Sequence, residues 1–243
     1  MRVIAHRGYS AAYPENTALA FEKAMAAGAD LIETDVRLTL DGQAVCWHDA
    51  SLQRVSGDPR TVAELTLAEF KDVALPQGQS PLDLGSVLAL ARGRAGVLLD
   101  VKLGTENLLQ AIVAALEATR MTAQVVYGVR QPGQYGVLRR HLPEVRVLAM
   151  PADPESLPEH LDECVSAVRL WEGEVTPERI ARIHRAGREA WVTAGLRASG
   201  EPPGYLTAGR AAMLWHLGVD AVLVNDPPLA LAASSDSTRK AKA

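Results

Sequence analysis

The sequence predicts an α/β protein folded as a single (β/α)8 barrel, the TIM-type barrel. Eight short apolar runs rich in β-branched residues recur along the chain, and segments with helical periodicity separate most of them. Eight parallel strands alternating with helices can close into a barrel. An open, doubly wound sheet is the alternative, but the first run ends in His6-Arg7-Gly8 rather than in a Gly-rich phosphate loop.

The expected strands are the eight apolar runs, and the clearest expected helices lie between them. The strands are residues 3–5, 31–36, 97–101, 124–128, 145–149, 166–170, 189–193 and 220–224. The helices are residues 17–27, 105–120, 177–186 and 207–217.

One domain is expected over residues 1–231, with a short helical insertion that follows the second strand and its hairpin. The insertion covers about residues 49–94, where two helical patterns are joined by a linker rich in Pro, Gly and Gln. The tail, residues 232–243, lacks large apolar residues to bury and is expected to be disordered.

Composition excludes several classes of partner. The net charge of −4 provides no global field that would attract nucleic acid or an anionic membrane. No secretory signal and no apolar stretch of about 18 residues is present, and Cys46 and Cys164 show no metal-ligand spacing. A soluble, cytoplasmic protein with a small-molecule substrate is therefore expected, and the sequence does not define its oligomeric state.

Three carboxylates are expected at one rim, because reactive groups of parallel barrels lie at the C-terminal ends of the strands. Glu33 and Asp35 are two residues apart on a strand and share a face, and burying both against the outer helices would be costly. Asp100 and Lys102 follow the same logic on the third strand. Oxygen ligands favour one divalent cation, Mg²⁺ or Ca²⁺, over zinc. Alternatively, Lys102 and a water neutralise the acids in a structural network.

A hairpin is expected to bring a histidine to this rim. Asp41-Gly42, flanked by alternating residues, predicts a two-residue turn, which would place Asp35 opposite His48 on the same face. Cys46, two residues before His48, would then also face the site. A register with His48 and Asp35 on opposite faces would contradict this prediction.

His6, at the end of the first strand, reaches the same rim. A single core histidine is more often structural, but two histidines beside carboxylates supply the proton acceptor and donor that displacement at phosphorus requires. Arg7 and Lys102 can hold phosphoryl oxygens, although a surface salt bridge is the alternative for Arg7.

Four further residues have open interpretations. Glu15 either favours the first turn of a helix or orients Arg7 or a histidine. Asn16 and Thr17 are both candidates to cap that helix. Trp191, at a late rim, can form an aromatic wall for an alcohol moiety, although packing is the commoner function of tryptophan.

Short motifs recur in an order that is similar to one known family. They are His-Arg-Gly at 6–8, Pro-Glu-Asn-Thr at 14–17, Glu-Thr-Asp-Val at 33–36, Thr-Leu-Asp-Gly at 39–42, His48-Asp49, Leu-Asp-Val-Lys at 99–102, Trp-Val-Thr at 191–193 and Asn-Asp-Pro at 225–227. Together they resemble the glycerophosphodiester phosphodiesterase family over nearly the whole chain.

The resemblance implies hydrolysis of glycerophosphodiesters to glycerol 3-phosphate and an alcohol, in lipid metabolism. It implies that His6 and His48 are the acid–base pair. Glu33, Asp35 and Asp100 would hold the divalent cation, and Arg7 and Lys102 would bind phosphate. It also implies that a substrate hydroxyl attacks first and forms a cyclic phosphate that water then opens.

Departures from the family pattern bear on the substrate. The third acid is Asp100 where the family usually has Glu, the fourth strand ends in Tyr-Gly-Val-Arg at 127–130 rather than Ser-Phe, and Asn225 stands in a Thr position. Two alternatives therefore stay open. One is a phosphodiesterase acting on a lysophospholipid or another phosphodiester, and the other is a barrel that binds polyol phosphates without turnover.

Overall fold

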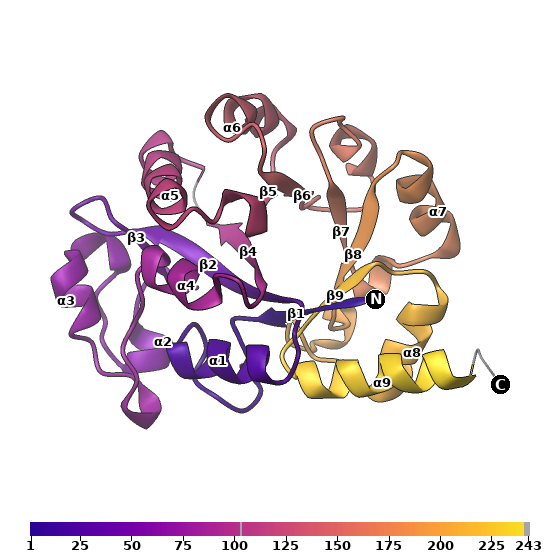
Figure 1. Cartoon of the computed structure of the whole chain (residues 1–243), viewed down its shortest axis with the longest axis horizontal. Helices are drawn as coiled ribbons and strands as arrows, with labels where there is room; N and C mark the ends of the chain where they lie inside the picture. Colours follow the sequence, from indigo (N-terminus) through magenta and orange to yellow (C-terminus); the bar gives the residue numbers. More distant parts are fainter. Residues whose placement is uncertain (103, 241–243) are drawn as a thin grey trace.

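Eight parallel strands close into a barrel in the structure, a computed structural model that describes residues 1–102 and 104–240. Each strand pairs with the next around the ring, and the last pairs with the first, so within the described chain the predicted fold class is confirmed (Figure 1). The eight barrel strands are β1 (Arg2–His6), β2 (Leu31–Leu38), β4 (Gly96–Val101), β5 (Val125–Val129), β6 (Arg146–Ala149), β7 (Ala167–Trp171), β8 (Glu189–Thr193) and β9 (Ala221–Val224).

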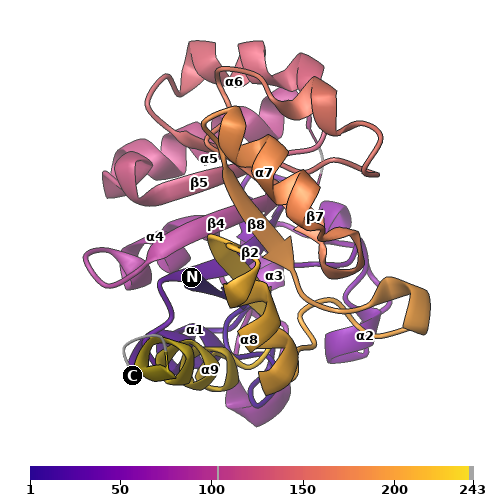
Figure 2. The ribbon, with the colours of Figure 1, turned by 90° about the vertical axis from the view of Figure 1, so that its right-hand side faces the viewer.

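Helices surround the barrel (Figures 1 and 2). They are α1 (Ala18–Ala26), α5 (Glu106–Thr119), α6 (Tyr135–His141), α7 (Pro177–Arg185), α8 (Ala208–His216) and α9 (Pro227–Lys240), besides those of the insertion. Each of the four helices expected from the sequence begins after a threonine whose side chain accepts a backbone hydrogen bond, at Thr17, Thr105, Thr176 and Thr207. No helix in the described residues is long and apolar enough to cross a bilayer.

The segment between the hairpin and β4 forms the expected helical insertion. It contains α2 (Gln53–Ser56), α3 (Leu67–Lys71), α4 (Leu84–Ala91) and the 3₁₀ turns Val62–Glu64 and Pro76–Gly78. Its first part buries a small core of its own, in which Trp47 packs edge-on against Phe70. Helix α4 instead packs on the main core through Leu84, Val87 and Leu88.

The chain after β9 continues as a helix. Although the sequence predicts a disordered tail from residue 232, α9 runs to Lys240, and residues 241–243 lie outside the described residues. Ala230 and Ala233 are buried, so the first turns of α9 are held by the core. Once a helix is nucleated, each further residue adds a hydrogen bond at low cost, which explains how it extends into a polar segment.

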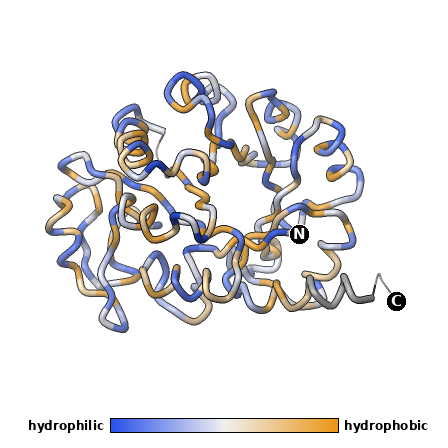
Figure 3. The backbone as a smooth tube through the Cα atoms, in the orientation of Figure 1, coloured by the Kyte–Doolittle hydropathy of each residue, from blue (hydrophilic) through white to orange (hydrophobic). Residues whose placement is uncertain are grey.

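The barrel interior is apolar at its base and polar at the C-terminal rim. The apolar cluster inside the barrel includes Ile4, Leu31, Leu98 and Trp191. Apart from those at the rim, hydrophilic residues lie mainly on the outer helices and loops (Figure 3). The strand register places His6 beside Glu33, and Asp35 beside Asp100. These polar side chains therefore lie directly above the apolar layer.

The register of the hairpin differs by one residue from the prediction. The backbone carbonyl of Asp35 accepts a hydrogen bond from the N–H of Trp47 at 3.0 Å, so Trp47 rather than His48 lies opposite Asp35. Strand β2 pairs with β3 (Ala44–Cys46) in the same register. The loop contains three residues instead of two, because the Thr39 hydroxyl closes it by accepting from the N–H of Gln43. Gly42, at φ 76°, completes the loop in the left-handed conformation typical of three-residue hairpins.

His48 nevertheless reaches the rim, by a different route. Strand β3 ends at Cys46, and the His48 carbonyl accepts hydrogen bonds from Nε and Nη2 of Arg37, at 2.9 and 2.6 Å. Cys46, which was expected to face the site, is instead buried in the outer core, and burial raises the pKa of its thiol to about 12.

Candidate active site

A cavity of about 150 Å³ opens at the C-terminal ends of the strands. Its lining divides into two groups on opposite strands of the ring. The β2 side comprises His6, Arg7, Glu33, His48, Asp100 and Lys102. The β7 side comprises Met150, Arg169, Trp171, Val192, Thr193 and Pro203.

The three carboxylates predicted to share an ion converge on the β2 side. One oxygen atom from each of Glu33, Asp35 and Asp100 lies within 4.8 Å of the others. Glu33 and Asp35 are almost completely buried. Burial, together with the charges of Asp35 and Asp100, raises the pKa of Glu33 well above its usual range. An uncompensated cluster of this kind favours a cation.

Side-chain cations neutralise part of this cluster. Lys102 Nζ lies 2.8 Å from Asp35 and 2.7 Å from Asp100, while Arg7 Nε lies 3.1 Å from Asp35. Burial acts to raise the pKa of Asp100, but Lys102 and Arg130 outweigh it and lower that pKa. Lys102 therefore neutralises part of the carboxylate charge, as it would if the acids formed a structural network instead of an ion site.

The cluster nevertheless retains capacity for an ion. Among the described residues, no cationic side chain forms an ion pair with Glu33. Oδ1 of Asp35 and Oδ1 of Asp100 are buried and accept no well-oriented hydrogen bond from any described residue, although Lys102 and Arg130 lie at ion-pair distance. Buried carboxylate oxygens without oriented donors fit a hard divalent cation, and among the described residues no histidine or cysteine belongs to the converging ligand group.

His6 is held in one tautomer by Asn225. Its Nδ1 lies 2.7 Å from Asn225 Oδ1, and the amide orientation is fixed because Asn225 Nδ2 donates to the carbonyl of Pro203 at 2.9 Å. Nδ1 therefore carries the proton, and Nε2 keeps its lone pair. Burial, assisted by the charge of Arg7, lowers the pKa of His6 to about 4, so the imidazole is neutral. Gly204 packs so closely that a Cβ there would lie 2.2 Å from Asn225 Oδ1.

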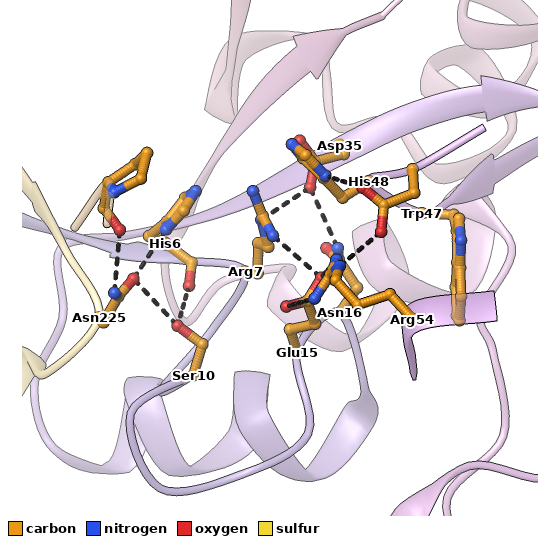
Figure 4. Close-up of polar contacts among 12 residues, drawn as sticks. His6, Arg7, Ser10, Glu15, Asn16, Asp35, Trp47, His48, Arg54 and Asn225 are labelled. Atoms are coloured by element: carbon orange, nitrogen blue, oxygen red, sulfur yellow. Dashed lines mark hydrogen bonds and ion pairs between the residues drawn. The ribbon is translucent and has the colours of Figure 1, made fainter. Parts of the chain in front are cut away.

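His48 is linked to Arg7 by a chain of charged groups (Figure 4). Its Nδ1 lies 2.6 Å from Asp49 Oδ1, and Arg54 joins Asp49, at 2.5 Å, to Glu15, at 2.6 Å. Glu15 in turn accepts from Arg7 Nη1 at 3.0 Å. Glu15 therefore contacts Arg7 and lies before α1, which begins at Ala18. Since Asp49 occupies Nδ1, Nε2 is the nitrogen of His48 that can face the cavity.

Asn16 has a position that the sequence analysis missed. Thr17 alone caps α1, whereas Asn16, at φ 55°, donates from Nδ2 to Asp35 Oδ2 at 3.1 Å and accepts from the Thr34 hydroxyl at 2.8 Å. A signal was available, because a helix has one N-cap residue and the motif offers two adjacent candidates. The side chain that does not cap the helix is free to hold a carboxylate.

The β7 side also differs from expectation. Trp191 lines the floor of the cavity but is 1% exposed, and its Nε1 donates to Glu189 at the N-terminal end of the same strand. Trp171 is the partly exposed tryptophan at the rim, and the guanidinium carbon of Arg169 lies 4.2 Å from its ring centroid. Arg169 was missed, although a charged residue within an apolar predicted strand was a usable signal.

Comparison with known proteins shows where this chain is similar to others. The sequence model described as the glycerophosphoryl diester phosphodiesterase family matches residues 6–126. A glycerophosphodiester phosphodiesterase of Caldanaerobacter subterraneus subsp. tengcongensis is 51% identical over 69 residues, which cover 28% of this chain and 28% of that protein. The chain thus matches less than a third of the length of this curated relative.

Similarity to solved structures extends over the whole barrel. A glycerophosphodiester phosphodiesterase from Agrobacterium tumefaciens has a TM-score of 0.80 at 23% identity, over 96% of this chain and 99% of that one. An Oleispira antarctica phosphodiesterase, solved with the product sn-glycerol-3-phosphate, has a TM-score of 0.82 at 22% identity, over 97% of both chains. At these identities the likeness concerns the fold.

Proposed function

We propose that this chain, which belongs to the glycerophosphoryl diester phosphodiesterase family, hydrolyses a glycerophosphodiester to glycerol 3-phosphate and an alcohol. The observation that carries the proposal is the cavity on the β2 side, where two imidazoles flank a cluster of three carboxylates. A barrel that only binds polyol phosphates would not need both imidazoles beside an acidic cluster.

Glu33, Asp35 and Asp100 would hold one divalent cation, Mg²⁺ or Ca²⁺, because their oxygen atoms converge and two of these atoms lack oriented donors. When bound, such an ion polarises phosphoryl oxygens and neutralises charge that develops in the transition state. Arg7 and Lys102 line the same cavity and would bind the remaining phosphoryl oxygens. Trp191 would limit how deep the substrate enters.

His6 would act as the first base. Its neutral Nε2 accepts the proton of the glycerol 2-hydroxyl as that oxygen forms a bond to phosphorus. His48 would act as the acid, because the Asp49 carboxylate at Nδ1 stabilises an imidazolium whose Nε2 carries the proton. As the bond between phosphorus and the alcohol oxygen breaks, this proton passes to the leaving alcohol.

The second half of the reaction reverses these roles. His48, now neutral, accepts a proton from the water that attacks the cyclic phosphate. His6, now protonated, returns its proton to the 2-oxygen of glycerol as the ring opens. Both imidazoles finish in their starting state, and no nucleophile of the protein is required.

The proposal is tested by His6→Ala and His48→Ala, with chelation as an independent arm. Each variant should lose on the order of 10²–10⁴ in kcat for glycerophosphodiesters, because each loses one proton-transfer partner. Circular dichroism and the melting temperature should show retained folding. Chelator should abolish turnover of the wild type, and Mg²⁺ or Ca²⁺ should restore it. Substantial turnover by both variants would rule out the assignment.

A cytoplasmic location completes the proposal. Cys46 and Cys164 are both free thiols, which is typical of a reducing compartment. Fractionation of the source cells would test it, and enzyme found outside the cytoplasm would contradict it.

A further inference from the structure

The β7 side of the cavity carries a buried guanidinium group that forms no ion pair with any described residue. Arg169, on β7, is 9% exposed, and its Nη2 donates to the carbonyl of Pro151 at 3.1 Å. Its Nη1 is buried and has no hydrogen-bond partner among the described residues. No carboxylate of those residues lies within ion-pair distance of it. A buried charge without a partner is costly, so this position is suited to an anion.

A second arginine lies close to the first. The guanidinium carbon of Arg197 is 4.6 Å from the ring centroid of Trp171, and that of Arg169 is 4.2 Å from the same centroid. Arg197 is exposed, and it too forms no ion pair within the described part of the chain. Two like charges against one indole repel each other, and an anion between or above them would relieve this repulsion.

The loop that carries Arg197 is positioned by buried polar groups. Glu172, 5% exposed, accepts from the backbone N–H of Gly195 at 2.8 Å and also binds the guanidinium of Arg210. Arg210 pairs in addition with Glu201, 2.9 Å away, at the other end of the loop. The loop backbone beside Arg197 is therefore anchored by the ion pairs of Arg210 with Glu172 and Glu201.

Strand order places this basic pair on the side of the cavity opposite the carboxylates of β2. In the ring of eight strands, β7 is the fourth strand from β2 in either direction, so Arg169 lies across the barrel from Glu33 and Asp35. A second hollow shares Trp171 with the cavity and continues outward past Arg197 and Glu174. Glu174 is already engaged there, since it accepts from the N–H of Trp171 at 2.9 Å. A diester with its phosphate at the carboxylates would extend its second arm toward the two arginines.

We propose that Arg169, Arg197 and Trp171 form a subsite for an anionic group, a carboxylate or a phosphate, on the alcohol moiety of the substrate. The proposal rests on the phosphodiesterase function proposed above. An unoccupied aromatic wall would suit a quaternary ammonium group. Here two guanidinium groups already lie against the Trp171 ring, so they repel a cationic alcohol and attract an acidic one.

The test uses three glycerophosphodiesters that differ only in the alcohol: 3-hydroxypropanoate, its amide, and choline. The wild type should hydrolyse the carboxylate with the highest kcat/KM. Arg169→Met should lower kcat/KM for the carboxylate at least about tenfold, as expected for lost hydrogen bonds to a charged group, while the amide changes less than about threefold. Arg197→Met should show a smaller loss with the same selectivity. Arg140→Met, at an exposed position on α6, is the matched control and should change neither value.

The outcomes separate this proposal from the one on which it rests. An equal loss for carboxylate and amide would mean that Arg169 holds the scissile phosphate, and no loss for either would mean that it holds no ligand. Both results overturn the subsite. Release of glycerol 3-phosphate from any of the three diesters supports the phosphodiesterase function whatever the variants do. With chelator present to prevent turnover, calorimetric titration of the carboxylate and the amide onto wild type, Arg169→Met and Arg197→Met repeats the comparison as a measurement of binding alone.

Discussion

The two sides of the cavity differ in how their charged side chains are paired: those of the β2 side, apart from Glu33, form ion pairs with one another, whereas the two arginines of the β7 side form none with described residues. On the β2 side, an unbroken series of contacts runs from His48 through Asp49, Arg54, Glu15, Arg7, Asp35 and Lys102 to Asp100. On the β7 side, Arg169 and Arg197 lie against an indole and pair with no described carboxylate. A site that is organised before substrate arrives supports the chemical step, whereas unsatisfied groups await a ligand. Substitutions on the β2 side should therefore lower kcat, and those on the β7 side should change selectivity and KM.

The largest effect is expected from Asp35→Asn. The substitution preserves shape but removes the charge of a proposed ion ligand, which should lower kcat/KM by at least about a thousandfold, since a bound ion would contribute several kcal/mol to the transition state. Glu22→Gln, at an exposed position on α1, is the matched control and should leave turnover unchanged. The measurements are steady-state kinetics and calorimetric titration with Mg²⁺ and Ca²⁺. An Asp35→Asn enzyme with cation-dependent turnover within about tenfold of the wild type would contradict the contrast between the two sides.

Most of the barrel could be predicted from the sequence, because its signals are local. Strand β8 begins and ends at the predicted residues, and α1 and α8 begin after the threonines that cap them. The hairpin register could not be predicted, because a two-residue and a three-residue loop share the same Asp-Gly signal. The Thr39 hydroxyl decides between them through contacts that exist only after the chain has turned.

The candidate site likewise contains residues that the sequence predicts and residues whose contacts it does not predict. Groups at strand ends, such as His6, Glu33 and Asp100, were predicted because the fold class alone places strand ends at one rim. Asn16, Asn225 and Arg54 were missed as partners of these groups, because they come from loops and from a short helix. Their contacts join residues as much as 219 positions apart in the sequence, and the periodicity of apolar residues contains no information on such long-range contacts.

An intermediate effect is expected from Asn16→Gly. Glycine permits the left-handed backbone at φ 55° but removes the amide that donates to Asp35, so the result reports on the hydrogen bond rather than on backbone strain. Cation affinity should fall on the order of tenfold to a hundredfold, as for other groups that orient a metal ligand. Calorimetric titration of Mg²⁺ measures it. Unchanged affinity would show that Asp35 is oriented by Lys102 and Arg7 alone.

The smallest effect is expected from a histidine that lies near the β7 side but does not line the cavity. His160, in the 3₁₀ turn Leu157–His160, is buried, and its Nδ1 lies 2.5 Å from the Tyr135 hydroxyl. Burial lowers the pKa of His160, and the charge of Arg169 acts in the same direction. Because His160 does not line the cavity, His160→Gln should leave kcat and the preference for an anionic alcohol unchanged, unlike His6→Ala.

The variant should differ from the wild type in how its stability depends on pH. Because the pKa of His160 is lower in the folded than in the unfolded protein, the unfolded chain binds an extra proton between that lowered pKa and the usual 6.5. Acidification through this range should destabilise the wild type by at most about 1.4 kcal/mol per pH unit more than His160→Gln. Urea unfolding of both proteins at a series of pH values from 7.5 to 5 measures the difference. Parallel stability curves over this range would show that His160 keeps its ordinary proton affinity in the fold, and that the Tyr135 contact does not depend on a neutral ring.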